Sequence, residues 1–190
     1  MHTKKLALAL LGLLITSVSC STSLDKEKEQ LKGCIVQFNI NRFDCLPSKI
    51  RRQDPDTLQD GFKFIVFYDS IGCNSCRIEK LGNWNAIVTR MNSIAPVKFY
   101  FIFAPTECQY DEIAQKYYFH KFVHDIYIDR KGAMQRENPF LNNTKYHCFL
   151  IGNDNKLLFV GDPTKEKFIE IALANVIKSI SSTDLTDKQQ

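Results

Sequence analysis

The sequence predicts a single-domain α/β protein in which helices flank a central mixed sheet. Runs of apolar and aromatic residues that suit buried strands alternate with stretches whose apolar residues recur at helical spacing. The chain has 190 residues, of which 44% are apolar and 24% are charged, and this composition is typical of a globular protein. It excludes a disordered or collagenous chain, and the length leaves little room for a second domain.

Residues 1–19 have the pattern of a secretory signal peptide. Lys4 and Lys5 precede an apolar core that runs for ten residues from Leu6 to Ile15, and small residues follow it. A membrane span needs about 20 apolar residues. We therefore expect cleavage, with a transmembrane anchor or a buried N-terminal helix as the alternatives.

Cys20 is the expected first residue of the mature chain. The run Val18-Ser19-Cys20 resembles the lipobox of bacterial lipoproteins, in which the cysteine carries lipid. Ser17 stands where that family prefers Leu, Val or Ile, so secretion without lipid is the alternative. The resemblance implies that acyl chains on Cys20 anchor the protein to a membrane, with residues 20–33 as a polar tether.

Residues 34–61 form an expected N-terminal extension. From Cys34 to Ile40, apolar and polar residues alternate, which predicts a half-buried strand added to the sheet. Prolines and a glycine among charged residues predict a connecting loop over residues 43–61.

The predicted main domain spans residues 62–179 and begins with a strand, a turn and a helix. The apolar run 62–68 suits a strand that is buried on both faces. Residues 69–72 form a turn. Residues 74–92 repeat apolar side chains at helical spacing, which predicts one amphipathic helix.

The rest of the main domain continues the alternation of strands and helices. A capping-box pattern marks the start of the second helix, and two short apolar runs around a turn predict a hairpin. In order, we expect a strand at 97–104, a helix from 106 to about 119, a strand at 125–129, hairpin strands at 147–151 and 157–160, a helix at 164–178 and a polar tail at 180–190.

The candidate reactive site is the C-x-x-C segment formed by Cys73 and Cys76 at the start of the first helix. Two thiols at this spacing can close a small disulfide ring, and the N–H groups and dipole of the helix favour the thiolate of the first. We expect Cys73 to attack and Cys76 to resolve. Arg77 adds positive charge and Asp69 is a nearby carboxylate, so both are candidates for tuning the pKa of the thiols.

Zinc binding is the alternative use of a C-x-x-C pair. Zinc needs two further ligands, and His120 and His124 have a suitable spacing but span a helix end and a strand start. The order strand, C-x-x-C, helix favours redox chemistry. We therefore predict no metal and no cofactor.

This context resembles the thioredoxin-like superfamily, in particular the membrane-tethered thiol–disulfide oxidoreductases of the TlpA type. The resemblance covers residues 62–178 and rests on the strand before Cys73, the C-x-x-C at a helix start, and stretch 149–156, which is similar to the closing F-L-I-D-x-x-G-K hairpin of that branch. More narrowly, residues 68–77 and 159–163 resemble uncharacterised thioredoxin-like lipoproteins of the Bacteroidota. The resemblance implies a thioredoxin-like fold and disulfide exchange with protein thiols or disulfides of the cell envelope.

Two positions depart from the family pattern. The family's W-C-G-P-C is absent, with Gly72 before the first cysteine and a different dipeptide between the two. The cis-proline of the family corresponds to Tyr146, where we expect a trans bond because a cis bond before a non-proline residue costs about 3–4 kcal/mol. By the same resemblance, Tyr146 and His147 are the candidate substrate groove.

The other cysteines leave alternatives open. Cys34 and Cys45 are close in sequence and form a possible second disulfide, or else they are buried unpaired thiols. Cys108 and Cys148 are third redox thiols or, as we favour, core residues.

Three functions follow from these observations. The first is an oxidoreductase that acts on envelope proteins together with an unidentified redox partner. The second is a binding module with a structural disulfide, and the third is a metal carrier that uses Cys73, Cys76 and His147. The formal net charge is +4 and the basic residues are scattered among acids, so we expect no nucleic-acid partner.

Overall fold

The computed structural model describes residues 30–50 and 61–187. The chain divides into two compact units, residues 1–32 and 33–190, and the following account concerns the second. The predicted signal peptide, Cys20 and most of the predicted tether lie outside the described residues.

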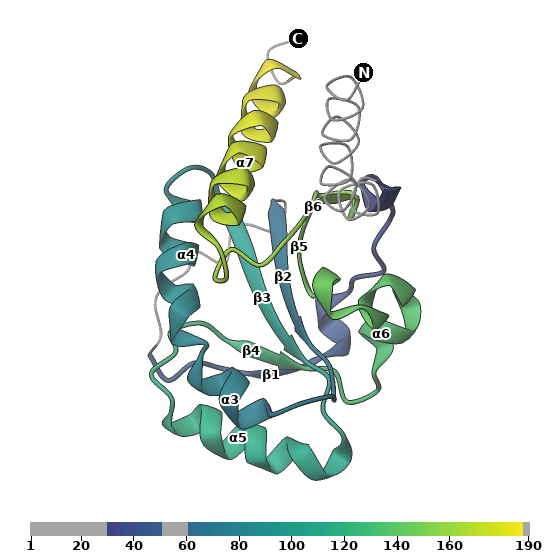
Figure 1. Cartoon of the computed structure of the whole chain (residues 1–190), viewed down its shortest axis with the longest axis vertical. Coiled ribbons are helices and arrows are strands. Elements are labelled where there is room, and N and C mark those ends of the chain that lie inside the picture. The colour runs from purple at the N-terminus through teal and green to yellow at the C-terminus, as the bar shows by residue number, and fades with distance from the viewer. Residues whose placement is uncertain (1–29, 51–60, 188–190) are drawn as a thin grey trace, which may run out of the picture. The chain divides into compact units, whose positions relative to one another are not determined.

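A six-stranded mixed sheet forms the centre of the second unit (Figure 1). The strands β2 and β3 run parallel, in a register that starts at Phe62↔Val97 and ends at Tyr68↔Phe103, and β4 is parallel to β3. The other pairings, β1 with β4, β5 with β2 and β6 with β5, are antiparallel. The order is β1-β4-β3-β2-β5-β6, with bounds β1 Asp44–Leu46, β2 Phe62–Tyr68, β3 Val97–Phe103, β4 Ile126–Ile128, β5 Cys148–Ile151 and β6 Leu157–Val160.

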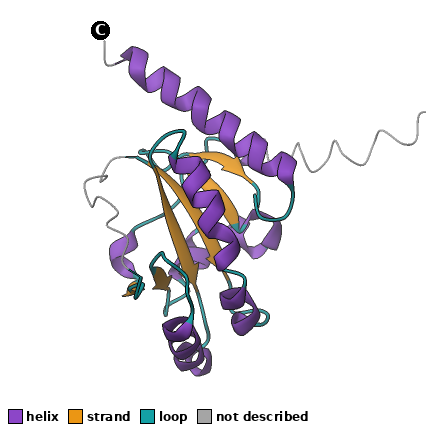
Figure 2. Ribbon diagram, turned by 90° about the vertical axis from the view of Figure 1, so that its left-hand side faces the viewer, coloured by secondary structure: helices purple, strands orange, loops and turns teal. Residues whose placement is uncertain are grey.

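Helices cover both faces of this sheet (Figure 2), which confirms the predicted α/β class. On one face, the Trp84 ring packs against Phe64 with ring centroids 5.8 Å apart. On the other face, the Phe140 ring meets the edge of Phe149 at 5.5 Å. The helices are α3 Asn74–Glu79, α4 Gly82–Asn92, α5 Tyr110–Phe119, α6 Ala133–Glu137 and α7 Lys167–Asp187, and the 3-10 turns are η1 Ile40–Arg42, η2 Glu107–Gln109, η3 Pro139–Asn142 and η4 Thr144–Tyr146.

The single helix predicted for residues 74–92 is two helices, α3 and α4. Between them the chain is wound more tightly, because Leu81 N donates to Ile78 O (3.0 Å) and Trp84 N donates to Leu81 O (2.9 Å). The three apolar residues Ile78, Leu81 and Trp84 are spaced by three rather than by 3.6 residues, so a tighter 3-10 winding keeps all of them on the buried side. Gly82 lowers the cost of ending a helix at this point.

The prediction of a strand from Cys34 to Ile40 is wrong. In this stretch the structure has one isolated bridge, between Ile35 and Lys156. After this bridge the backbone of Gln37 bonds the side chain of Asn138 in both directions, at 2.8 and 3.0 Å, so no strand partner remains for it. The added N-terminal strand is β1, which lies within the stretch predicted as a loop and pairs with β4. Alternation of apolar and polar residues identified a half-buried segment but did not specify its hydrogen-bond partner.

The other predicted elements have the predicted type and differ at their ends, whereas α6 and the turns η1, η3 and η4 were not predicted. The capping box at Thr106 is present, but it opens the turn η2, which leads into α5. The predicted last helix spans 164–178, whereas α7 starts at Lys167 and continues to Asp187, through most of the residues predicted as a polar tail. Among the described residues, no helix is both long and apolar enough to cross a membrane.

Candidate functional site

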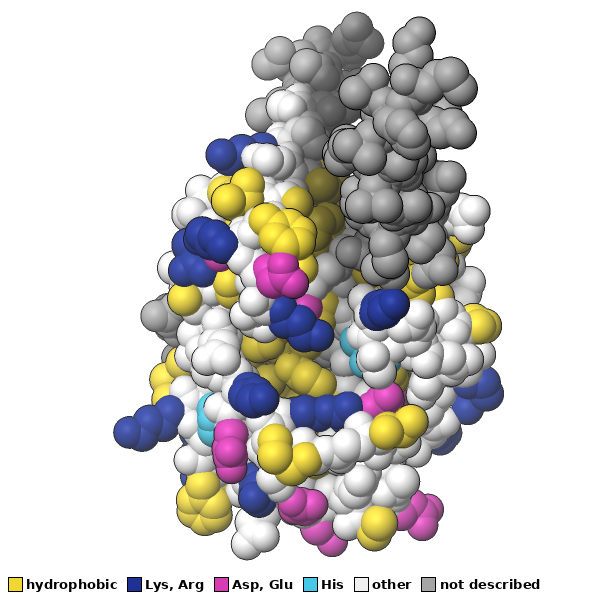
Figure 3. Space-filling view, viewed as in Figure 1, with side chains coloured by type: hydrophobic (Ala, Val, Ile, Leu, Met, Phe, Trp, Pro, Cys, Tyr) yellow, Lys and Arg dark blue, Asp and Glu magenta, His cyan; other side chains and the backbone are white. Residues whose placement is uncertain are grey.

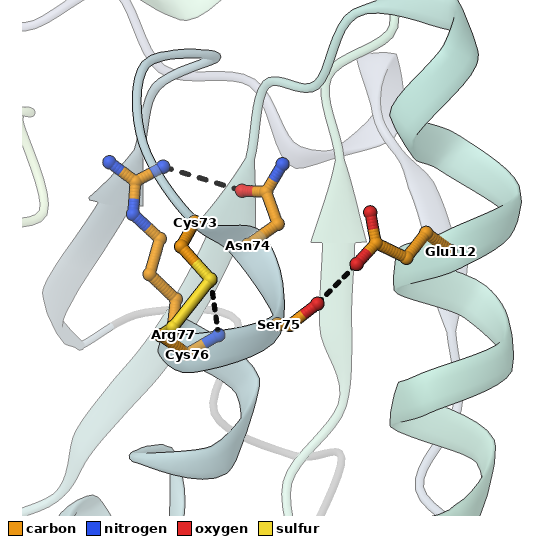
Figure 4. The surroundings of a disulfide bond; sticks show 6 residues. All are labelled: Cys73, Asn74, Ser75, Cys76, Arg77 and Glu112. Carbon is orange, nitrogen blue, oxygen red and sulfur yellow. Dashed lines mark hydrogen bonds between the residues drawn. A yellow bond between two sulfur atoms is a disulfide. The ribbon is translucent and has the colours of Figure 1, made fainter.

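Cys73 and Cys76 form a disulfide at the start of α3, with their Cα atoms 5.4 Å apart (Figure 4). Cys73 is the N-cap residue of this helix, and its sulfur accepts a hydrogen bond from Cys76 N at 3.2 Å. Both cysteines are exposed. The ring therefore presents its sulfur atoms to solvent at the helix end where backbone N–H groups lack carbonyl partners.

The loop from Asp69 to Gly72, which we call the dithiol loop, carries the chain from the end of β2 to the disulfide. Gly72 has a φ of +100°, in the region that glycine adopts without a steric penalty. A side chain at this position would also lie against the guanidinium of Arg77, because a Cβ atom there would be 3.6 Å from Nη2. Glycine thus permits the reversal that places Cys73 at the helix start.

Arg77 fixes the shape of this loop. Its guanidinium donates to the Asp69 carboxylate at 2.7 Å and to the carbonyl oxygens of Asp69 and Ile71, each at 2.5 Å. The Asp69 side chain is only 4% exposed and also accepts from Ile71 N at 3.2 Å. The two residues predicted to tune the thiols therefore form one ion pair beside Cys73, and their effect on the thiol pKa stays a prediction.

The two residues inside the disulfide ring have different surroundings. Asn74 is buried, and its Oδ1 accepts from Arg77 Nη1 at 3.3 Å. Ser75 points the other way, and its hydroxyl donates to the Glu112 carboxylate of α5 (Figure 4). Sequence reasoning missed Glu112, because no local pattern indicates which face of α5 meets α3.

Tyr146 and His147, the predicted substrate groove, lie beside the end of β2. The carbonyl of His147 accepts from Phe67 N at 2.8 Å, two residues before the dithiol loop. The side chains of Tyr146 and His147 are only 7% and 8% exposed, so they are not surface groups. The described residues contain no cis peptide bond, which confirms the trans bond expected at Tyr146.

The His147 ring is held in an apolar site. Its Nε2 lies 2.9 Å from Leu141 O, and its ring meets the edge of Phe67 with centroids 5.2 Å apart. Burial lowers the pKa of His147 below its ordinary value, so the ring is neutral at pH 7. Because Nε2 donates its hydrogen to this carbonyl, the lone pair of the neutral ring lies on Nδ1, which is the nitrogen that a metal carrier would use. The described residues hold no cluster of three groups that could bind a metal.

The possible Cys34–Cys45 disulfide is contradicted by the structure. Cys45 lies in β1 at one edge of the sheet, whereas the Cys34 carbonyl accepts from Leu157 N of β6 at the other edge. Five strand spacings of about 4.8 Å separate these edges, or about 24 Å. A disulfide needs Cα atoms within about 7 Å of each other.

Cys148 and Cys108 differ in their exposure to solvent. Cys148 is buried as predicted, and burial raises the pKa of its thiol well above the ordinary value. Cys108, for which core packing was the favoured prediction, is exposed in η2. The pattern around Cys108 marked a helix start, but the exposure of Cys108 depends on how the helical segment is rotated about its axis relative to the sheet.

The face of the molecule shown in Figure 3 mixes apolar and charged side chains of both signs. Ile71, immediately before Gly72 in the dithiol loop, is 74% exposed. On the face shown in Figure 3, the described basic residues form no continuous stripe of the kind that binds nucleic acid.

No protein-family model and no curated protein matches the chain. A solved structure of a thioredoxin-like protein in the oxidized form aligns with a TM-score of 0.52 at 15% identity, over 79% of this chain and 98% of that one. A putative thiol:disulfide interchange protein, DsbE, from Chlorobium tepidum shares 17% identity over 75% of this chain and 96% of that one, with a TM-score of 0.43. StoA from Bacillus subtilis shares 16% identity over 68% and 96%, with a TM-score of 0.41.

At such low identity the likeness shows the fold and nothing finer. The first of these alignments covers nearly the whole of the thioredoxin-like protein, so it extends over a complete domain and not over one shared motif. In this chain, the second unit is built on the mixed sheet, with the C-x-x-C at the start of the helix that follows β2. The chain has a thioredoxin-like fold.

Proposed function

We propose that the chain is an exported, lipid-anchored thiol–disulfide oxidoreductase that exchanges disulfides with envelope proteins through Cys73 and Cys76. The observation that carries the proposal is an exposed disulfide at a helix start, on the loop that follows a central parallel strand. Structural disulfides are more often sheltered, whereas exchange needs a sulfur that another protein can reach.

The exchange proceeds in two displacement steps. In the reduced protein, the Cys73 thiolate attacks one sulfur of a partner disulfide, a mixed disulfide forms, and the other partner sulfur leaves as a thiolate. Cys76 then gives its proton to solvent and attacks the Cys73 sulfur, which closes the ring and releases the second partner sulfur as a thiolate. The partner gains two electrons and the protein loses two, and the same steps run in reverse when the partner is oxidised.

The geometry supports Cys73 as the attacking residue. Its sulfur already accepts a hydrogen bond from Cys76 N, and the same donor stabilises the Cys73 thiolate after reduction. The helix dipole adds a smaller contribution in the same direction. Cys76 lies within the first turn, where it is positioned to resolve the mixed disulfide.

Export and lipid anchoring rest on the N-terminal sequence. The signal-peptide pattern of residues 1–19 and the lipobox-like ending at Cys20 support them. In an oxidising compartment, protein thiols and disulfides are available as partners. Replacement of Cys20 by Ala should release the protein from membranes, and an equally membrane-bound Cys20→Ala protein would contradict the anchor.

Titration against reduced and oxidised glutathione tests the activity. We expect Cys73 and Cys76 to interconvert reversibly between dithiol and disulfide, as measured by alkylation and mass spectrometry.

Trapping of mixed disulfides in cell envelopes is the second experiment. The Cys76→Ser protein should accumulate mixed disulfides on Cys73, whereas the Cys73→Ser protein should not. Cys108→Ser is the matched control, because it removes an exposed cysteine outside the ring. A disulfide that resists glutathione would replace the enzyme with a binding module, and stoichiometric metal on the reduced protein would replace it with a metal carrier.

A further inference from the structure

Glu112, in the first turn of α5, is hydrogen-bonded to a residue of the disulfide ring. The hydroxyl of Ser75, which lies between the two cysteines, donates to the Glu112 carboxylate (Figure 4). Among the described residues, the side chain of Asn74, the other residue inside the ring, bonds within its own segment, to Arg77. The Ser75–Glu112 bond is thus the side-chain link from the ring to a second helix.

The position of Glu112 is fixed by the start of α5. The Thr106 capping box, closed by Gln109, holds the first turn of this helical segment. The side chain of Gln109 also reaches the Ser70 carbonyl in the dithiol loop, at 3.5 Å. Two contacts, Glu112 with Ser75 and Gln109 with Ser70, therefore join the start of α5 to the segment that carries the disulfide.

The charge of Glu112 is not cancelled by a partner. Among the described residues, no salt bridge includes Glu112, and Arg77 is already paired with Asp69. A groove of about 360 Å³ between α3 and α5 is lined by Ser75 and by the titratable side chains Glu79, Lys116 and His120. Lys116 follows Glu112 by one turn of α5 without forming a salt bridge to it within the described residues, so a net negative charge remains beside Ser75.

We propose that Glu112 is a positioning residue that holds Ser75 and, through its negative charge, shifts the Cys73–Cys76 equilibrium toward the disulfide. This inference rests on the proposed function. Reduction breaks the sulfur–sulfur bond, and the dithiol form carries a thiolate for part of the time. A carboxylate on the far side of Ser75 repels that thiolate and so disfavours the reduced form.

The expected size of the effect follows from distance. Ser75 and Cys76 are neighbours, so the carboxylate and the sulfur atoms lie on the order of 8 Å apart. At that distance, one charge changes the ionisation equilibrium of the other by about twofold in bulk water and by about 30-fold at the effective dielectric constant near a protein surface. For these exposed groups we take an intermediate value of about fivefold, which applies in full when the Cys73 thiol is ionised. This fivefold change equals about 20 mV in the two-electron potential.

The test compares four variants in the same glutathione titration. Glu112→Gln removes the charge but keeps an oxygen that accepts from Ser75, and we expect it to shift the equilibrium about fivefold toward the dithiol. Glu112→Asp keeps the charge and should remain within about twofold of the wild type. Asp111→Asn is the matched control, since Asp111 lies on the face of α5 opposite the buried Ile113 and should behave as the wild type. Ser75→Ala keeps the charge and should shift the equilibrium less than Glu112→Gln does.

A second measurement separates charge from structure. In a Cys76→Ser background, Glu112→Gln should lower the pH midpoint of Cys73 alkylation by about 0.7 unit, and the difference should shrink in high salt. An unchanged equilibrium and midpoint in Glu112→Gln would overturn the inference, as would a larger shift in Ser75→Ala. A wild-type disulfide that fails to titrate at all would instead overturn the proposed function, so the two failures are distinct.

Discussion

The dithiol loop, residues 69–72, and the N-terminal segment, residues 33–46, both contain irregular backbone, and each is joined to a helix by a charged pair. In the loop, the buried Asp69 bonds Arg77, which is eight residues away. In the segment, Arg42 makes two hydrogen bonds to Glu137, at 2.6 and 2.8 Å, across 95 residues. These two side chains are 44% and 31% exposed.

The difference in surroundings gives the two pairs different roles. Arg77 also bonds two carbonyl groups of the loop, so the pair determines a backbone shape that has no regular hydrogen-bond pattern of its own. The Arg42–Glu137 pair adds to a position that the Gln37–Asn138 bonds already fix. When a buried ion pair is broken, the remaining group lacks a hydrogen-bond partner, whereas water hydrates the group that remains from an exposed pair.

The largest expected effect is that of Asp69→Ala. This change leaves the Arg77 guanidinium and Ile71 N without their buried acceptor, and we expect unfolding by urea to show a loss of about 2–3 kcal/mol. The value lies below that of a fully buried pair because the Arg77 side chain is partly exposed. Glu137→Ala is the control and should change the urea midpoint far less. Equal losses of unfolding free energy in the two variants would show that the buried pair and the exposed pair contribute equally to stability.

Gly72→Ala tests the backbone of the same loop. Because φ is +100° at Gly72, alanine there should cost about 1–2 kcal/mol of unfolding free energy. Gly82 lies at the start of α4, where a Cβ atom would have no neighbour within 4 Å, so Gly82→Ala should instead stabilise by about 0.5–1 kcal/mol. Urea denaturation of both variants distinguishes a conformational requirement from a general sensitivity to glycine replacement.

The N-terminal segment should show a small dependence on pH. The hydrogen bond from Arg42 holds the pKa of Glu137 below its ordinary value of 4.5. A carboxyl group with a lowered folded-state pKa stabilises the fold above the unfolded-state value and loses that contribution as the pH falls through the folded-state value. We expect Glu137→Gln to lower Tm by about 1–2 °C at pH 7 and to match the wild type near pH 3. A difference that persists at pH 3 would show that charge is not the cause.

The smallest effect concerns the cysteines of the N-terminal segment. In a Cys73→Ser/Cys76→Ser protein, a reducing agent should leave Tm unchanged, because Cys34 and Cys45 lie at opposite edges of the sheet. A fall of several degrees, together with a Cys34–Cys45 peptide in a non-reducing map, would contradict the described pairing of the segment.

The sequence by itself determined the elements that local chemistry specifies. The buried run 62–68 and the C-x-x-C that follows it placed Cys73 at a helix start, because strand burial and helix capping depend on a few neighbouring residues. The Thr106 capping box and the hairpin of β5 and β6 were predictable for the same reason. The break between α3 and α4 was missed, because the apolar pattern over 74–92 predicts one continuous helix.

Tertiary structure decided which distant residues meet. The alternation after Cys34 predicted a half-buried strand, but after one bridge between Ile35 and Lys156 the Gln37 backbone bonds the Asn138 side chain, and only packing over 101 residues of separation settles that choice. Glu112 lies on a predicted helix, yet the rotation of α5 against α3 brings it to Ser75. Such contacts depend on the register of the sheet and the orientation of each helix, which are set by burial of the whole core and not by any short stretch of sequence.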